Sequence, residues 1–239
     1  MEKLDVVLLV GRPAAGKSEV IDFLAGLDDA TRLREYRLGP FTVLDDFVYV
    51  WETFENDAIR THMGMPRRDT DEALYFLDDR VWEFYIERVD LDFRKQLARS
   101  PDYLNTHSVL MEFARGGDSA YARAFQHLSD EVLDRACILY VDVSFEESLR
   151  KNRRRFRPGQ EDSILYHSLE DAKMERYYRT DDWRELTGDR DDGYLTIRGR
   201  SVPFAVFHNE PEQTLDPALL GPALRQATGT LMRLFKPQG

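Results

Sequence analysis

Cysteine and histidine are scarce in this chain of 239 residues, which has one cysteine and five histidines. A single thiol excludes an internal disulfide, and Cys137 lies in an apolar run, so we expect a buried core residue rather than a nucleophile. The histidines are scattered and show no metal-ligand spacing, so none is assigned a role. The sequence therefore gives no indication of a disulfide scaffold or of a metal centre built on histidine or cysteine.

Long apolar runs are also missing. No run approaches the roughly 20 residues that span a bilayer, and the apolar run 6–10 is too short for the core of a signal peptide. The formal net charge is −11, and an acidic surface repels nucleic-acid phosphates and anionic membranes. We therefore predict a cytoplasmic protein that binds neither nucleic acid nor membrane, with a local basic site for any small anionic ligand.

Short apolar segments dominate the structural pattern of the chain. They are residues 6–10, 41–44, 108–111, 137–143 and 203–207. They are continuous rather than alternating, which is typical of parallel strands covered on both faces. Helical patterns lie between them, so we predict one α/β domain over 1–239, with a doubly wound, mostly parallel five-stranded sheet. Residues 194–197 and the turn after them predict a hairpin with the last strand.

Two segments are longer than the sheet requires. Residues 47–106 exceed a plain crossover, and we interpret them as a helical, substrate-binding insertion. The aromatic side chains in this insertion are expected to form mainly helix core, with stacking on a substrate ring as the alternative. Residues 150–180 start with a basic run and continue into a second helical pattern, which predicts a lid.

Residues 11–18 match the phosphate-binding motif G-x-x-x-x-G-K-[ST]. The motif lies between an expected strand and an expected helix, so its backbone N–H groups and the helix N-terminus would point at phosphate oxygens. Lys17 is expected to reach the β- and γ-phosphates and Ser18 to bind Mg²⁺. We therefore predict binding of ATP, or of a close relative such as GTP, with Mg²⁺. The predicted nucleotide contacts here are Gly11, Pro13, Ala14, Ala15, Gly16, Lys17, Ser18 and Glu19.

Carboxylates follow the second and third predicted strands. Asp45 and Asp46 end the second, and Glu112 ends the third. Ligands of such sheets bind at the carboxyl ends of the strands, so these side chains are expected to converge near Lys17. A GTPase is excluded because no D-x-x-G follows a strand and no guanine-binding N-K-x-D or T-K-x-D motif is present.

These features together resemble the uridine kinase, phosphoribulokinase and nicotinamide riboside kinase group of P-loop kinases. The resemblance rests on residues 11–18, on Leu44-Asp45-Asp46-Phe47, on Glu112 and on the basic run after the fourth strand. It implies that Asp45 is the base-like catalytic residue facing an acceptor hydroxyl. It also implies that Glu112 supports the metal or the acceptor, with Asp46 beside the substrate, and that lid arginines contact phosphates.

Two further segments resemble nucleotide kinases more loosely. Glu112-Phe113-Ala114-Arg115 is similar to a substrate-binding motif of nucleoside monophosphate kinases, which makes Arg115 a candidate substrate contact. The segment 207–212 resembles the adenine-contacting loop of nucleotide kinases, which makes Asn209 a candidate contact to the base.

A basic run follows the fourth predicted strand. It contains Arg150, Lys151, Arg153, Arg154, Arg155 and Arg157. We interpret the run as part of a lid, because guanidinium groups neutralise the charge of a transferring phosphoryl group. A nucleic-acid patch and a solvated helix face are the alternatives. Arg154 is the predicted catalytic arginine and Arg150 a nucleotide contact, with Arg157 on the same helix face.

The sequence thus predicts an ATP- and Mg²⁺-dependent phosphotransferase that acts on a small metabolite at a hydroxyl group. The predicted catalytic residues are Lys17, Asp45, Glu112 and Arg154, and the predicted metal contacts are Ser18 and Glu112. Two alternatives stay open. One is a nucleoside monophosphate kinase, and the other is a regulatory NTP-binding module without a small-molecule acceptor.

Overall fold

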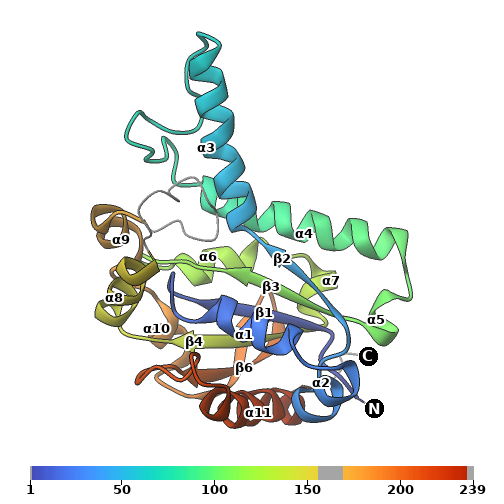
Figure 1. Ribbon diagram of the computed structural model, residues 1–239. Helices are drawn as coiled ribbons and strands as arrows, with labels where there is room; N and C mark the ends of the chain where they lie inside the picture. The colour runs from blue at the N-terminus through green and yellow to red at the C-terminus, as the bar shows by residue number, and fades with distance from the viewer. Residues whose placement is uncertain (1, 156–168, 236–239) are drawn as a thin grey trace.

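The computed structural model describes residues 2–155 and 169–235 and has a single twisted sheet at its centre (Figure 1). The strands are β1 (Val6–Gly11), β2 (Phe41–Asp45), β3 (Ser108–Phe113), β4 (Ala136–Asp142), β5 (Asp192–Ile197) and β6 (Arg200–His208). Their order is β2-β3-β1-β4-β6-β5. The first five strands in this order pair in parallel, and β5 pairs antiparallel to β6 at the edge. The predicted α/β fold is therefore confirmed, with the predicted hairpin adding a sixth strand.

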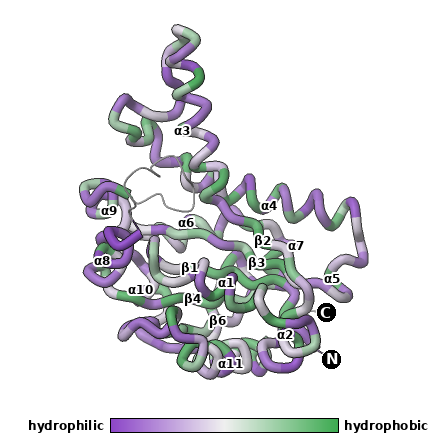
Figure 2. Tube along the Cα trace, in the orientation of Figure 1, coloured by the Kyte–Doolittle hydropathy of each residue, from purple (hydrophilic) through white to green (hydrophobic). Residues whose placement is uncertain are grey.

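Helices cover both faces of the sheet. One face carries α1 (Lys17–Ala25), α2 (Asp29–Tyr36) and α11 (Pro217–Leu234), and the other carries α4 (Val81–Arg99), α6 (Ala120–Gln126), α7 (Asp130–Leu133) and α10 (Trp183–Thr187). Alternate residues of β1 serve the two layers. Val6, Leu8 and Val10 belong to the core under α4 and α6, whereas Val7 and Leu9 belong to the core under α1 and α11. This double burial explains why the central strands β1, β3 and β4 are nearly continuous apolar runs (Figure 2).

Residues 47–106, which we interpreted as an insertion, belong in part to the helical layer and in part to a projection. It contains α3 (Phe47–His62), a connection over 63–80, α4, and α5 (Tyr103–Thr106). Because α4 contributes Ile86, Val89 and Phe93 to a sheet core, it belongs to the helical layer. Only α3 and the connection project away from the sheet (Figure 1).

A buried aspartate holds the connection against α3. The Asp57 side chain, 0 % exposed, accepts hydrogen bonds from the backbone N–H groups of Arg68, Asp69 and Thr70 and from the Thr70 hydroxyl. Burial alone would raise the pKa of Asp57, but these four donors favour the carboxylate and lower the pKa to about 2. These hydrogen bonds therefore fix the projecting segment together with a separate apolar cluster around Val50, Phe76 and Tyr85.

The predicted lid includes two helices, α8 (Phe145–Arg155) and α9 (Asp171–Tyr178). Both lie beside the carboxyl ends of the parallel strands (Figure 1), and α8 is mostly hydrophilic along its length (Figure 2). Arg157, predicted to share a face with Arg154, lies outside the described residues. Within the described ranges, no helix has the length and apolarity needed to cross a membrane.

Candidate active site

The turn between β1 and α1 requires glycine at two positions. Gly16 has φ +116°, and a side chain there would place its Cβ 2.5 Å from Nδ2 of Asn209. Gly11 has φ +155°, and a Cβ there would lie 2.5 Å from the carbonyl oxygen of Val141. Backbone this close to its neighbours leaves no room for another residue type. The two motif glycines therefore allow the loop to close tightly between the sheet and the segment after β6.

Asn209, in the segment after β6, supports this loop through hydrogen bonds. Its side chain is 0 % exposed, and Nδ2 donates to the carbonyl of Ala15 at 2.7 Å and lies 3.1 Å from the Thr214 hydroxyl. Its Oδ1 accepts from the backbone N–H groups of Gln213 and Thr214, at 2.7 and 3.2 Å. The predicted contact of Asn209 with the base is therefore wrong for this arrangement, because the buried amide already uses both donors and both acceptor positions.

Two more side chains fix the loop to neighbouring elements. Ser148, on α8, donates its hydroxyl to the carbonyl of Pro13 at 2.7 Å. Arg12 donates to the carbonyl of Val143 at 3.1 Å and pairs with Asp181 at 2.7 Å. The β1–α1 loop is therefore held from α8, from the end of β4 and from the segment after α9.

Lys17 is buried at the start of α1, with 5 % exposure. Its Nζ donates to the carbonyls of Gly11 and Arg12, at 3.2 and 3.0 Å, and lies 4.0 Å from a carboxylate oxygen of Glu112. Burial lowers the pKa of Lys17, and the nearby Glu112 opposes this effect. Ser18 follows Lys17 and is exposed at the first turn of the helix. The ammonium group thus lies over the loop, next to the carboxylates that were expected to converge on it from the strand ends.

Asp45 and Glu112 are register partners at the ends of β2 and β3. Burial, together with the charges of Glu112 and Asp46, raises the pKa of Asp45 to about 7, against the opposing hydrogen bond from the Phe47 N–H. Burial also raises the pKa of Glu112, which Lys17 opposes. Two adjacent buried carboxyl groups resist double ionisation. The site is therefore arranged to keep or release a proton near neutral pH.

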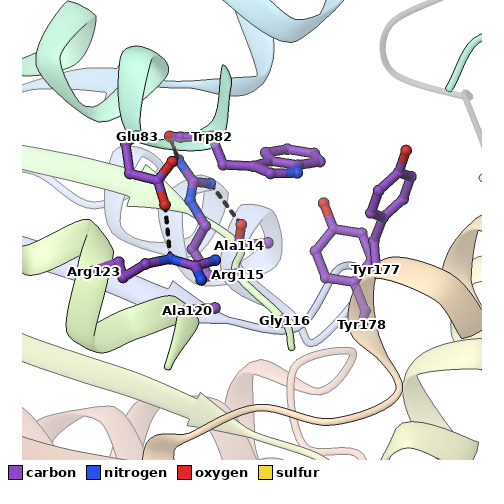
Figure 3. A pocket seen from close by; sticks show the side chains of 9 residues that line it. All are labelled: Trp82, Glu83, Ala114, Arg115, Gly116, Ala120, Arg123, Tyr177 and Tyr178. Atoms are coloured by element: carbon purple, nitrogen blue, oxygen red, sulfur yellow. Dashed lines mark hydrogen bonds and ion pairs between the residues drawn. The ribbon is translucent and has the colours of Figure 1, made fainter. Parts of the chain in front are cut away.

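Asp46 and Arg115 form a buried pair rather than two independent groups. Their charged atoms are 2.5 Å apart, and both residues are 4 % exposed. Arg115 also donates to the carbonyls of Ala114 and Trp82, at 2.6 and 2.8 Å (Figure 3). Both predicted substrate contacts therefore line the cleft, but their opposite charges neutralise each other.

The basic residues of α8 point in two directions. Arg154 forms two bonds with Glu212, at 2.8 and 2.9 Å, and Arg150 pairs with Glu147 at 2.6 Å and with Glu212 at 3.4 Å. Arg150 and Arg154 therefore share a face, as predicted. Arg155 lies on the neighbouring face and reaches Glu19 at 3.2 Å.

Arg155 was not selected from the sequence. It lies close enough to Lys17 to contribute to the lowered pKa of that lysine, after the larger effects of burial and Glu112. Lys151, also on α8, is buried, with Nζ 3.4 Å from Glu212. Helical spacing identifies the two faces of a basic helix, but the sequence does not say which face lies over the phosphate loop.

One cleft of about 680 Å³ joins these groups. Among the predicted site residues, those that line the cleft are Pro13, Ala14, Lys17, Ser18, Glu19, Asp45, Asp46, Glu112, Arg115 and Arg154. Gly11, Ala15, Gly16, Arg150 and Asn209 do not line it and instead shape or support its walls. The remaining walls come from α8, from α9 and from aromatic side chains of the projecting segment. The β1–α1 loop, the paired carboxylates and a group of apolar side chains therefore line one cavity.

No family model matches this chain, and no curated protein matches its sequence. Solved structures with a related chain path include a sugar kinase from Janibacter sp. HTCC2649, with 14 % identity and a TM-score of 0.41 over 94 % of this chain and 97 % of the other. Shikimate kinase from Acinetobacter baumannii, in complex with shikimate, has 16 % identity and a TM-score of 0.35 over 77 % and 78 %. TT1252 from Thermus thermophilus has 16 % identity and a TM-score of 0.44 over 98 % and 100 %. At this level of similarity, the neighbours do not identify what this chain does.

Proposed function

We propose that this protein is an ATP- and Mg²⁺-dependent phosphotransferase that acts on a hydroxyl group of a small molecule. The observation that carries the proposal is the convergence of Lys17 with Asp45 and Glu112 in one cleft, 4.0 Å separating Lys17 Nζ from Glu112. A nucleotide-binding module needs the lysine and the loop. Carboxylates with raised pKa values beside the lysine support a second reactant and its chemistry.

On the donor side, the carbonyls of Gly11 and Arg12 now occupy the Lys17 ammonium, and a phosphate oxygen would take their place. The loop N–H groups and the α1 N-terminus would bind the other phosphate oxygens. The Ser18 hydroxyl and the Glu112 carboxylate fit Mg²⁺, which prefers a few protein oxygens together with phosphates and water. Bound Mg²⁺ would neutralise charge on the phosphates. In the described residues, no cluster of three or more His, Cys, Asp or Glu offers an all-protein metal cage.

On the acceptor side, Asp45 is the proposed general base. A pKa of about 7 lets the group accept a proton at neutral pH while keeping some driving force for the transfer. The acceptor oxygen would bind between Asp45 and the terminal phosphoryl group held by Lys17. Asp45 would orient the hydroxyl and take its proton as the new bond forms.

Arg155 is the proposed guanidinium contact of the transferring group. It lies on the face of α8 toward Glu19 and Lys17, whereas Arg154 is bound by Glu212. Lys151 and Arg154 also line the cleft and add positive charge beside the phosphate loop. We assign Arg150 and Arg154 to the outer part of the nucleotide site, and Arg155 to the reacting end.

The test has two stages. Calorimetry measures ATP–Mg²⁺ binding to the wild type and to Lys17→Ala, and then ADP release is measured with a set of hydroxyl compounds. We expect the wild type to bind ATP–Mg²⁺ and Lys17→Ala to bind it much more weakly. We also expect at least one acceptor to stimulate ADP release. Lys95→Ala is the control, since this lysine is on α4 with its side chain 45 % exposed. Slow ADP release that no acceptor changes would instead support the regulatory NTPase, and transfer only to nucleoside monophosphates would support the nucleotide kinase.

A further inference from the structure

Aromatic rings line a large part of the cleft. The ring wall consists of Phe54, Phe76, Trp82, Tyr177 and Tyr178, all of which line the cavity. Phe54 and Phe76 are stacked with centroids 5.5 Å apart, and Trp82 meets Phe76 and Tyr177 edge-on at 5.0 and 5.6 Å. Figure 3 shows the Trp82 ring extending toward the two tyrosines. Phe54, Trp82 and Tyr177 are only partly buried, so ring surface is available inside the cavity.

The ring wall is fixed before any ligand binds. Its members come from α3, from the connection over 63–80, from the start of α4 and from α9. The backbone N–H of Phe76 donates to the Tyr177 hydroxyl at 3.3 Å, which joins the connection to α9. Asp57 fixes the same connection to α3 through four hydrogen bonds. A preformed aromatic surface binds a flat or apolar body without a large ordering cost.

Two basic side chains that line the cleft beside the ring wall, Arg115 and Lys173, already have acidic partners. The two terminal nitrogens of the Arg115 guanidinium are bound to Asp46 and to two carbonyls. Lys173 lines the same side of the cleft, is 8 % exposed, and has Nζ 3.8 Å from Glu170. The neighbouring carboxylates Asp45 and Glu112 would repel an anionic acceptor. A phosphate or carboxylate carried by the acceptor would therefore lose its hydration without gaining an unpaired cation among the described residues that line this side of the cleft.

The geometry points to an uncharged alcohol with an aromatic or otherwise flat ring as the acceptor. This inference rests on the proposed phosphotransferase function and names the substrate class of the same site. The ring would pack on the ring wall, and the hydroxyl would reach Asp45. The acceptor oxygen forms a bond to the terminal phosphorus of ATP, the bond from that phosphorus to the bridging oxygen breaks, the hydroxyl proton passes to Asp45, and ADP leaves.

The experiment compares matched acceptors with the full chain. Uridine and adenosine are each set against the 5′-monophosphate and against ribose, and pyridoxine serves as an aromatic alcohol of another kind. ADP release is measured with ATP–Mg²⁺, and acceptor binding is measured by calorimetry with a non-hydrolysable ATP analogue. We expect at least one uncharged ring compound to have a kcat/KM about tenfold or more above its monophosphate and above ribose.

Variants of the ring wall separate stacking from general damage. Phe54→Ala should raise the dissociation constant of the ring compound by about tenfold, and Phe54→Tyr should restore it because the ring is retained. Phe84→Ala is the matched control, since Phe84 lies two positions after Trp82 with 62 % exposure.

The outcomes distinguish this inference from the function on which it rests. A preference for ribose or for a monophosphate would overturn the inference. It would also be overturned if ATP–Mg²⁺ binds but the ring compounds neither bind nor stimulate ADP release. If a ring compound binds in a Phe54-dependent way without ADP release, the ring site stands and the phosphotransferase proposal fails.

Discussion

Asp45 and Glu112 lie opposite each other at the carboxyl ends of the neighbouring parallel strands β2 and β3. Both residues are partly buried, and the pKa of Asp45 is raised to about 7 by burial and by its acidic neighbours. Lys17, 4.0 Å from Glu112, is the nearby cation that favours ionisation of both. This relationship places a titrating group beside the phosphate loop, and it makes the proposed chemistry testable through pH.

Asp45→Asn should lower the acceptor-stimulated rate by ~10²–10⁴, with ATP–Mg²⁺ affinity nearly unchanged. The amide keeps the size of the side chain but cannot take the proton. In the wild type, kcat/KM should fall as the pH drops below about 7, because Asp45 becomes protonated. Steady-state kinetics between pH 5.5 and 8.5 test this, and the variant should lose that dependence. A variant with wild-type turnover would move the base role to Asp46 or Glu112.

The same carboxyl group should make folding stability depend on pH. The pKa of Asp45 is higher in the folded protein than its ordinary value of 3.8. Its contribution to stability is therefore fully present below pH ~4 and is lost as the pH rises through about 7. Between pH 5 and 7.5, Asp45→Asn should gain free energy of unfolding relative to the wild type, on the order of 1–3 kcal/mol. Urea unfolding at both pH values measures this difference, and an equal difference at both would contradict the assignment.

The sequence predicts those features of the fold and the site that depend on local patterns along the chain. Apolar runs gave the strands, and the carboxyl-end rule brought Asp45 and Glu112 together beside Lys17. Arg155 was missed because spacing reveals two basic faces of α8, while only tertiary packing selects the one toward Glu19. The role of Asn209 was missed for a similar reason. Its partner Ala15 is 194 positions away, and no local pattern records such a contact.

Arg155→Ala should reduce kcat by ~10²-fold or more, with a smaller loss of ATP affinity. A guanidinium near the reacting end acts mainly on the transition state. Arg154→Ala should have the smaller effect on kcat, because Arg154 is paired with Glu212. Arg153→Ala is the control, since Arg153 is exposed and pairs with Asp171 at 2.6 Å. Initial rates at saturating acceptor, together with calorimetry, test which variant loses more kcat. A larger loss in Arg154→Ala would restore Arg154 as the catalytic arginine.

Asn209→Ala should destabilise the fold and weaken nucleotide binding together. The buried amide bonds the carbonyl of Ala15 inside the phosphate loop and two N–H groups of its own segment. Leaving these groups unsatisfied should cost about 1–3 kcal/mol in the free energy of unfolding. ATP affinity should fall for the same reason, since the loop would lose its support. Urea unfolding and calorimetry measure the two effects.

Asn209→Asp refines this test because it keeps both acceptor positions of the side chain and removes only the Nδ2 donor. A carboxylate oxygen would then face the Ala15 carbonyl, so we expect a loss at least as large as that of the alanine variant. Asn105→Ala is the control, because the Asn105 side chain is exposed and bonds only Asp102, at 3.2 Å, among the described contacts. If Asn209 instead contacted the nucleotide base, Asn209→Ala would change the preference for ATP over GTP without changing the free energy of unfolding. A parallel loss of affinity for both nucleotides, together with lower stability, is the outcome that a buried support residue requires.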